Sequence, residues 1–270
     1  MEIIPNNKLL DLTGKTAIVT GGAVGIGYGI TFRFAQAGAN VVIAARSIDE
    51  AEKVASDLTT KGYKVKAVKA DVANQADVTN LVAETVKLFG QIDILVNNAG
   101  IFPINPLATM EFADFHKVLQ INLAGVFLTT KYVSEQMKKQ GKGGKIINVT
   151  SIDALHPSMI GLAHYDASKH AVWGFTKNVA LELAQYGITV NAIAPGGVAT
   201  PGVAKMQGAS VKPVDAATAK ANSDAFLATL PLKRMGEPDE IGKVALFLAS
   251  DMASYMTGSQ VVVDGGALIT

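Results

Sequence analysis

The sequence predicts an α/β fold in which helices cover both faces of one parallel sheet. Short runs rich in β-branched and apolar residues alternate with longer segments that have helical apolar spacing. The short runs show little alternation of apolar and polar residues, which is typical of strands buried on both faces. Repeated strand–helix units with right-handed crossovers then give a doubly wound sheet.

Seven strands are expected, separated by helices. The strands are Thr16–Thr20, Val41–Ala45, Lys64–Ala70, Ile92–Asn97, Lys145–Thr150, Thr189–Ala194 and Gln260–Val263. Helical spacing occurs near residues 25–38, 49–61, 74–89, 111–139, 165–186 and 237–250. The one long connection, residues 198–230, is rich in small residues and partly helical in pattern (216–230), so we expect it to form a lid. No linker or repeat interrupts the chain, which predicts a single domain over residues 1–270.

The composition excludes several classes of function. The chain has 270 residues, of which 49% are hydrophobic and 17% charged, a balance typical of folded proteins. A net charge of +1 gives no general attraction to nucleic acid or to an anionic membrane. The absence of cysteine excludes disulfides, thiolate catalysis and cysteine-based metal sites, and the four histidines lack metal-ligand spacing. With neither a signal-peptide pattern nor an apolar run of about 18 residues, we expect a cytoplasmic protein without a metal.

A glycine-rich loop follows the first strand and leads directly into a helix. It reads Thr20-Gly-Gly-Ala-Val-Gly-Ile-Gly27, with the spacing Gly-x3-Gly-x-Gly rather than the common G-x-G-x-x-G. Glycines permit a tight turn and a close approach of phosphate to the backbone, and the helix N-terminus offers free N–H groups. Gly21, Gly25, Ile26 and Gly27 are therefore predicted to hold a dinucleotide.

The end of the second strand predicts which dinucleotide is preferred. An acidic residue there would bind the ribose 2′-hydroxyl, but this chain has Arg46 and Ser47, which suit a 2′-phosphate. We therefore expect NADP(H) to be preferred, with NAD(H) still possible. The alternative is that Arg46 caps the strand or pairs with Asp49 or Glu50.

Tyr165 and Lys169 lie four residues apart in a segment with helical spacing, so their side chains share one helix face. A neighbouring cation favours the phenolate, and we expect it to lower the pKa of Tyr165 from about 10. Such a pair can exchange a proton with an alcohol oxygen near neutral pH.

Taken together, these motifs resemble those of the short-chain dehydrogenase/reductase family, of the classical type. The resemblance covers residues 12 to 267 and implies a Rossmann-type domain with a seven-stranded parallel sheet. The motifs that carry it, in chain order, are Thr20–Gly27, Asp71-Val72, Asn97-Asn98-Ala99-Gly100, Asn122, Ser151, Tyr165-x3-Lys169, Asn191-x3-Pro195-Gly196, Arg234-Met-Gly-Glu-Pro238 and Asp264-Gly265-Gly266.

The resemblance implies a role for each matching residue. Tyr165 would be the general acid in carbonyl reduction and the base in alcohol oxidation. Lys169 would lower its pKa and hold the nicotinamide ribose, Ser151 would stabilise the substrate oxygen, and Asn122 would hold a water of a proton relay. The remaining positions would bind the cofactor: Asp71 and Val72 at the adenine, Asn98, Ala99 and Gly100 on the adenosine side, and Pro195, Gly196, Val198 and Thr200 at the nicotinamide.

Three details around the predicted catalytic residues stay open. The interval from Ser151 to Tyr165 is about one residue longer than is usual in the family. Thr150 and Ser151 are adjacent hydroxyls, and only position after the strand favours Ser151. Asp153 is a candidate either for binding a substrate hydroxyl or for capping the loop.

The function predicted is the interconversion of a ketone and a secondary alcohol by an NADP(H)-dependent oxidoreductase acting on a small molecule. Alternatives within the family are a 3-oxoacyl-carrier-protein reductase, to which the basic residues Lys138, Lys139, Lys142 and Lys145 would offer a docking surface, and a sugar or polyol dehydrogenase. A regulatory protein that senses NADP(H) is the alternative outside enzymes. The resemblance also implies a homotetramer formed through the segments 111–139 and 165–186 and the last strand.

Overall fold

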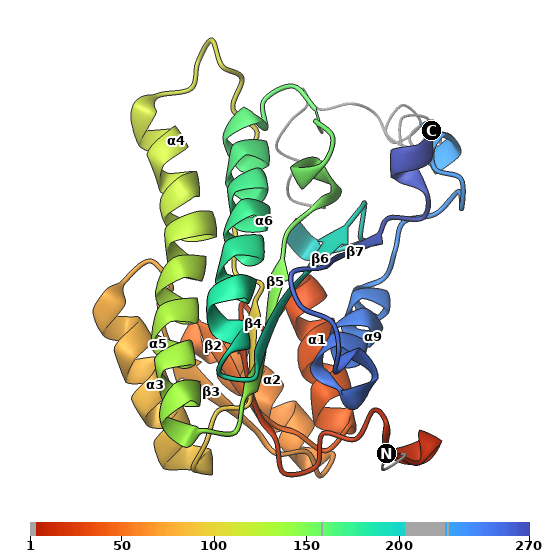
Figure 1. Cartoon of the computed structure of the whole chain (residues 1–270). Helices are drawn as coiled ribbons and strands as arrows, with labels where there is room; N and C mark the ends of the chain where they lie inside the picture. Colours follow the sequence, from red (N-terminus) through yellow and green to blue (C-terminus); the bar gives the residue numbers. More distant parts are fainter. Residues whose placement is uncertain (1–3, 158, 203–224, 226) are drawn as a thin grey trace.

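One seven-stranded parallel sheet organises the computed structural model, which describes residues 4–157, 159–202, 225 and 227–270. The strand order is β3-β2-β1-β4-β5-β6-β7, so the order reverses between β1 and β4 (Figure 1). The strands are β1 (Thr16–Thr20), β2 (Asn40–Ala45), β3 (Val65–Lys69), β4 (Ile94–Asn97), β5 (Gly144–Val149), β6 (Ile188–Pro195) and β7 (Gln260–Val263). The predicted fold class is therefore confirmed, and each predicted strand is present with ends shifted by no more than a few residues.

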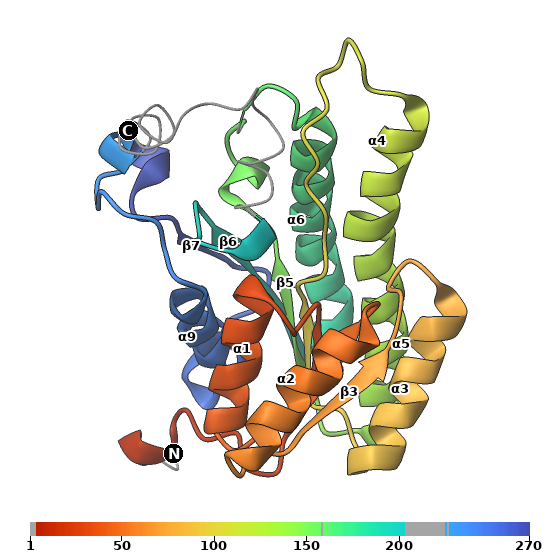
Figure 2. The ribbon, with the colours of Figure 1, turned by 180° about the vertical axis from the view of Figure 1, so that it is seen from behind.

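Helices cover both faces of the sheet. On one face lie α1 (Gly25–Gln36), α2 (Ile48–Thr60) and α9 (Pro238–Ala249), as the view from behind shows (Figure 2). The opposite face carries α3 (Gln75–Phe89), α4 (Phe112–Leu119), α5 (Gly125–Gln140) and α6 (Ala163–Ala184).

The strand side chains explain this layering. Ala17 and Val19 of β1 pack into the core under α1 and α9, whereas Ile18 between them packs into the core under α3, α5 and α6. Successive residues of a strand point to opposite faces, so a strand that is apolar throughout requires cover on both sides. All five residues of β1 are buried, and the two cores fix the sheet from which the site-bearing loops extend.

The segment predicted as one helix over residues 111–139 is instead three pieces. A π-helical turn, Gln120–Ala124, separates α4 from α5. A π turn adds one residue to a helix and shifts the following side chains around its axis, and such turns are frequent at functional sites. Apolar periodicity did not reveal it, because the helical spacing continues on both sides of the turn.

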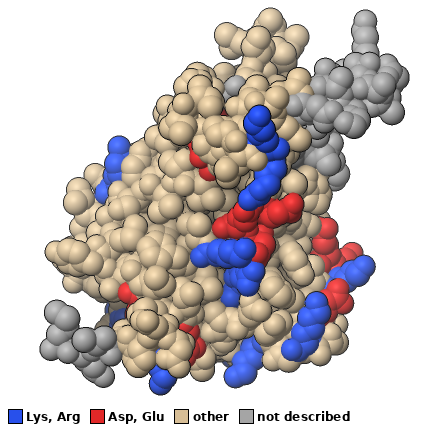
Figure 3. Space-filling view, turned by 90° about the vertical axis from the view of Figure 1, so that its right-hand side faces the viewer, with Lys and Arg blue, Asp and Glu red and all other residues tan. Residues whose placement is uncertain are grey.

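Ion pairs fasten the outer surface of α9. Acidic and basic side chains alternate on this face of the molecule (Figure 3). Asp239 pairs with both Arg33 of α1 and Lys243, and Glu240 pairs with Arg234 at 2.7 Å. The bidentate contact with Arg33 holds α9 against α1.

The predicted lid, residues 198–230, lies for the most part outside the described residues. Of its helical pattern over 216–230, residues 225 and 227–229 are described, and they are helical. Its described start follows β6, with Val198 bridging to Gly236. Across the described residues, the protein has no helix of sufficient length and apolar character to cross a membrane.

Candidate active site

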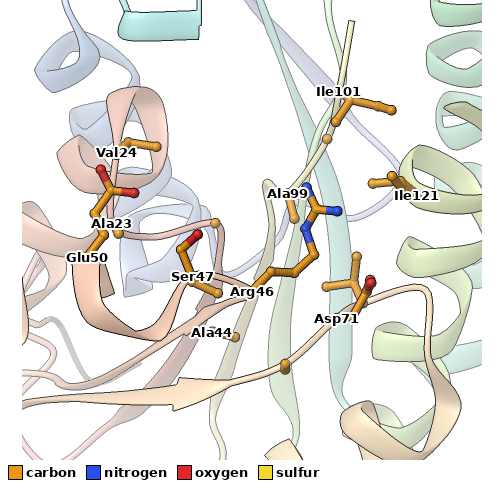
Figure 4. A pocket seen from close by; sticks show the side chains of 15 residues that line it. Ala23, Val24, Ala44, Arg46, Ser47, Glu50, Asp71, Ala99, Ile101 and Ile121 are labelled. Atoms are coloured by element: carbon orange, nitrogen blue, oxygen red, sulfur yellow. The ribbon is translucent and has the colours of Figure 1, made fainter. Parts of the chain in front are cut away.

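A pocket opens at the carboxyl ends of β1 to β4, where parallel sheets of this kind place their ligands (Figure 4). Seven of the residues predicted to bind the cofactor line it: Gly21, Arg46, Ser47, Asp71, Val72, Ala99 and Gly100. The pocket thus brings together the ends of four strands that are distant in sequence.

The glycine loop at this pocket is shaped for close approach of a ligand. Gly21 and Gly25 have φ angles of 64° and 51°, in the left-handed region that favours glycine. A Cβ atom added at Gly27 would lie 2.0 Å from the carbonyl oxygen of Gly21, so only glycine fits there. Helix α1 begins after Val24 without a side-chain cap, which leaves N–H groups of its first turn available to an anion. These features fit the pyrophosphate of a dinucleotide.

Thr20 and Asn98 connect the glycine loop to the residues that follow β4. The hydroxyl of Thr20 accepts hydrogen bonds from the backbone N–H groups of Asn98 (2.9 Å) and Ala99 (3.0 Å). The amide of Asn98 donates to the carbonyl oxygens of Thr20 (3.0 Å) and Gly21 (3.2 Å). Asn98 therefore ties β4 to the loop, whereas its neighbours Ala99 and Gly100 line the pocket.

Arg46 and Ser47 extend from the end of β2 into the pocket as exposed side chains (Figure 4). Within the described chain, Arg46 forms no ion pair with Asp49 or Glu50, so the alternative that it serves as a local partner has no support. The Glu50 carboxylate also lines the pocket. The guanidinium is therefore free to meet a phosphate, with two acidic residues, Glu50 and Asp71, in the same lining.

The predicted nicotinamide residues lie beside the glycine loop rather than in this pocket. A Cβ added at Gly25 would lie 3.1 Å from the side chain of Thr200. Gly196 packs closely on Asp264 and donates to the carbonyl oxygen of Val263 at the end of β7. Pro195 ends β6, and Val198 is buried. The chain after β6 thus reaches the start of α1.

Asn122 and Lys169 meet at the backbone of Gly100. A Cβ added at Gly100 would lie 3.2 Å from Oδ1 of Asn122 and 3.8 Å from Nζ of Lys169. The amide of Asn122 exchanges hydrogen bonds with the backbone of Ile101 (2.8 and 2.9 Å) and donates to Ser168 (3.1 Å). Both of its N–H hydrogens are therefore used within the protein, and only the second lone pair of Oδ1 remains for a water.

The structure separates the two adjacent hydroxyls. Thr150 is buried and donates to the carbonyl oxygen of Ile193 at 2.8 Å, which commits it to the sheet. Ser151 donates to the Asp153 carboxylate at 2.8 Å, and its oxygen accepts from the Asp153 backbone N–H at 3.2 Å. Ser151 is thus the N-cap of the turn Ile152–Ala154, and the Asp153 carboxylate accepts from the Ser151 hydroxyl rather than from a backbone N–H group of the described chain.

Tyr165 lies one helical turn from Lys169, as predicted. Nζ of Lys169 is 5.6 Å from the centre of the phenol ring and donates to the carbonyl oxygen of Val149 at 2.8 Å. The ring of Phe102 packs edge-on against Tyr165, at 5.9 Å between ring centres. Burial lowers the pKa of Lys169 to about 8, and the charge of Asp153 opposes this shift.

The prediction that Tyr165 has a lowered pKa is wrong for this chain. Burial raises the pKa of its phenol, and the charge of Asp153 acts in the same direction, while a hydrogen bond with Ser151 opposes both. Lys169 is not among the groups that shift this pKa. The sequence showed the adjacent cation but not the desolvation that outweighs it.

Several residues of the site were missed by sequence reasoning. The pocket is also lined by Ala23, Val24, Ala70, Ile101 and Ile121. Ile121 reaches the pocket from the π turn, which the periodicity did not predict. A signal existed for Thr20, because a hydroxyl at the end of the first strand can accept from backbone N–H groups at the end of the neighbouring strand, here those of Asn98 and Ala99.

The two histidines near the site, His156 in the loop and His164 in the first turn of α6, differ in exposure. His164 is completely buried, and neither ring nitrogen has a hydrogen-bond partner among the described residues. His156 is exposed, with Nδ1 at 2.9 Å from the carbonyl oxygen of Pro157. Of the two, only His156 lies on the surface of the loop.

The basic run Lys138, Lys139, Lys142 and Lys145 lies at the edge of the sheet opposite the site. These residues end α5 and begin β5, whereas Ser151 follows the other end of β5. Lys138 stacks over the ring of Tyr186, and burial lowers the pKa of Lys145. Within one chain, these lysines lie at the opposite end of β5 from Ser151.

Known proteins are similar to this chain in both sequence and fold. A family model described as enoyl-(acyl carrier protein) reductase matches residues 21–267. The oxidoreductase UcpA of Salmonella typhimurium is 43% identical over 260 residues, which cover 96% of each chain. A 3-oxoacyl-[acyl-carrier-protein] reductase of Synechocystis is 41% identical, covering 96% of this chain and 98% of that protein. The crystal structure of a short-chain type dehydrogenase/reductase from Mycobacterium marinum superposes with a TM-score of 0.89 at 36% identity, covering 97% and 98% of the two chains.

A doubly wound sheet with a pocket at the point where its strand order reverses, between β1 and β4, defines a dinucleotide-binding α/β protein. More particularly, the chain belongs to the short-chain dehydrogenase/reductase family. It is an oxidoreductase that acts on the CH–OH/C=O pair with NAD(P).

Proposed function

We propose that the chain is an NADP(H)-dependent oxidoreductase that interconverts a ketone and a secondary alcohol, with Tyr165 as general acid and base. The observation that carries this proposal is the convergence of Ser151, Tyr165, Lys169 and Asn122 beside a pocket suited to a dinucleotide. When bound, the dinucleotide supplies or accepts the hydride.

In carbonyl reduction, Tyr165 donates its proton to the substrate oxygen. Burial and the charge of Asp153 raise the pKa of the phenol, so it is protonated at neutral pH, which is the form that reduction requires. Ser151 donates a hydrogen bond to the same oxygen and stabilises the charge that develops there. Both groups sit at the carboxyl edge of β5 and the first turns of α6.

Lys169 has two roles in this proposal. It is buried but keeps its charge near pH 7, because its pKa remains about 8. Its ammonium would hold the nicotinamide ribose and return a proton to Tyr165 from the Asn122 side. Gly21, Gly25, Ile26 and Gly27 would hold the pyrophosphate, with Asn98, Ala99, Gly100, Asp71 and Val72 around the adenosine.

The preference for NADP(H) rests on the end of β2. Arg46 lies exposed in the pocket without an ion-pair partner among the described residues, and no acid occupies the strand tip. A planar guanidinium suits a 2′-phosphate. Introducing the acid with Ala45→Asp should shift the preference toward NADH.

A 3-oxoacyl-carrier-protein reductase is the second candidate, because a protein of that name is 41% identical over nearly the whole chain. The basic run near β5 gives it no further support, since it lies at the far edge of the sheet. A sugar or polyol dehydrogenase differs from both only in substrate.

The test follows the absorbance of the reduced nicotinamide at 340 nm with ketones, 3-oxoacyl thioesters, sugars and alcohols, each with NADPH or NADP and with NADH or NAD. The proposal expects turnover that favours the phosphorylated cofactor. Tight cofactor binding without turnover of any substrate would favour the alternative of a regulatory protein that senses NADP(H).

We also propose a homotetramer, as the family resemblance implies. Exposed apolar residues on the outer helices support it, among them Phe127, which packs edge-on against Phe175, and Leu181 at 78% exposure. Light scattering should give four times the chain mass, and a monomer at micromolar concentration would contradict the proposal.

A further inference from the structure

The Asp153 carboxylate holds the hydrogen that Ser151 needs for catalysis. Ser151 is 6% exposed, and its hydroxyl donates to Oδ2 of Asp153 at 2.8 Å. A serine hydroxyl has one hydrogen, so it cannot donate to Asp153 and to a substrate oxygen at the same time. Binding of a carbonyl substrate therefore takes this hydrogen away from the carboxylate.

Asp153 then lacks a donor. In the described part of the chain, Ser151 is the residue whose side chain donates to its carboxylate. Lys169 donates to Val149, and the Nδ1 nitrogen of His156 faces the carbonyl oxygen of Pro157. Burial already raises the pKa of Asp153, which indicates poor access to water. Removing one hydrogen bond from a partly buried carboxylate is costly unless the ligand replaces it.

We propose that the substrate itself replaces it: the substrate carries a hydroxyl on the carbon next to the reacting carbonyl, and Asp153 accepts the hydrogen of that hydroxyl. This inference rests on the proposed function. The substrate class is an α-hydroxy ketone in the reducing direction and a vicinal diol in the oxidising direction.

The distances permit this arrangement. A carbonyl oxygen and a carboxylate oxygen that both lie about 2.8 Å from Ser151 Oγ are about 4 to 5 Å apart at ordinary hydrogen-bond angles. A hydroxyl on the adjacent carbon lies about 3 Å from the carbonyl oxygen, so it is within hydrogen-bond reach of the carboxylate. A carboxylate has four acceptor positions, so it can accept this hydrogen once the Ser151 hydroxyl has turned to the substrate.

The reaction balances with the groups named. The carbonyl carbon gains the hydride that the reduced dinucleotide supplies as it is oxidised by two electrons, and the carbonyl oxygen gains the proton of Tyr165. The C=O double bond becomes a C–H and an O–H bond. The adjacent hydroxyl is unchanged and serves only in recognition.

Matched substrates that differ in one hydroxyl test the inference. The pairs are 1-hydroxy-2-butanone with 2-butanone for reduction, and 1,2-butanediol with 2-butanol for oxidation. We expect wild type to favour the hydroxylated member by roughly 10- to 100-fold in kcat/KM, the size of one buried hydrogen bond to a charged group.

Variants separate recognition from positioning. Asp153→Ala should bring the ratio within each pair close to one, mainly by lowering kcat/KM for the hydroxylated member. Asp153→Asn, which keeps the shape, should reduce the ratio less, because the amide retains one acceptor oxygen. Asp166→Asn is the electrostatic control, since Asp166 also raises the pKa of Tyr165 by its charge; it should alter both members equally.

Each result decides the question. A wild-type ratio near one with clear turnover of both ketones would overturn this inference and leave the proposed function intact. Equal losses for both members in Asp153→Ala would assign Asp153 to positioning Ser151 and would also overturn it. The absence of turnover for every ketone and alcohol would overturn the proposed function, and this inference with it.

Discussion

The two halves of the proposed site, one for the nucleotide and one for catalysis, are built from different parts of the chain. The nucleotide half consists mainly of backbone: glycines, uncapped N–H groups and strand ends, with exposed Arg46 as its free cation. The catalytic half consists of buried side chains that already have partners, as with Ser151, Lys169 and Asn122. The first half recognises by shape, so it is sensitive to volume. The proposed role of the second half is to hold and transfer protons, so its activity should respond to the loss of a single hydroxyl or amino group and to pH.

The largest expected effect falls on the catalytic half. Tyr165→Phe removes the proton donor and almost no volume, so kcat should fall by about 10³-fold or more. The Kd for NADPH, measured by fluorescence titration, should change by less than about threefold. Tyr186→Phe, at the surface beyond the far end of α6, is the matched control and should retain full activity. Substantial activity in Tyr165→Phe would refute the mechanism.

Gly27→Ala tests the nucleotide half, because it adds one methyl group to the glycine loop and changes no charge. The new Cβ would lie 2.0 Å from the Gly21 carbonyl oxygen and 2.7 Å from the amide nitrogen of Asn98. The loop must therefore move, and NADPH affinity should fall by about 100-fold or more, with a lower melting temperature. Gly174→Ala, on an exposed part of α6 with no atom within 4 Å of the added Cβ, should leave affinity unchanged. Normal NADPH affinity in Gly27→Ala would contradict the close-approach argument.

Lys169→Met tests whether burial of the charged Lys169 side chain destabilises the folded protein. Below pH 8 the lysine is charged both in the folded chain and in the unfolded chain, where its pKa is near 10.5, so the burial penalty is fully present. Between pH 8 and 10.5 the unfolded chain binds more protons, so this penalty diminishes as pH rises.

The free energy of unfolding of wild type, relative to Lys169→Met, should accordingly increase by about 2 kcal/mol from pH 7 to pH 10. Urea denaturation of both proteins across this range measures it. A difference that stays constant with pH would show that the pKa of Lys169 is not depressed in the folded chain.

The smallest effect is expected at the exposed edge of the nucleotide half. Arg46→Ala should raise KM for NADPH by about tenfold and leave KM for NADH nearly unchanged, because the guanidinium would meet only the 2′-phosphate. Its exposure keeps the effect modest. Lys53→Ala, on the following helix and outside the pocket lining, is a control for general charge. Equal changes in both KM values would remove the basis for the predicted preference.

Sequence reasoning predicted the nucleotide half better than the catalytic half, and the reason is physical. The strand positions, the glycine spacing and the place of Arg46 after the second strand follow from local patterns, and seven predicted residues line the pocket. The pKa of Tyr165 depends on burial by segments distant in sequence, and apolar spacing alone does not measure burial. The partnership of Asp153 with Ser151 depends on the conformation of one short turn. The role of residues 198–230 stays a prediction.

The π turn at Gln120–Ala124 has a consequence for chain length. Deleting one residue there would restore a regular helix between α4 and α5, and regular helices are ordinarily the more stable form. It would also rotate the following helix by about 100° relative to the preceding one. Asn122, Ile121 and Gly125, which packs against Val72, could not all keep their places. The site therefore depends on the number of residues in this turn as well as on their identity. We expect the variant that lacks one of these residues to be more stable but inactive.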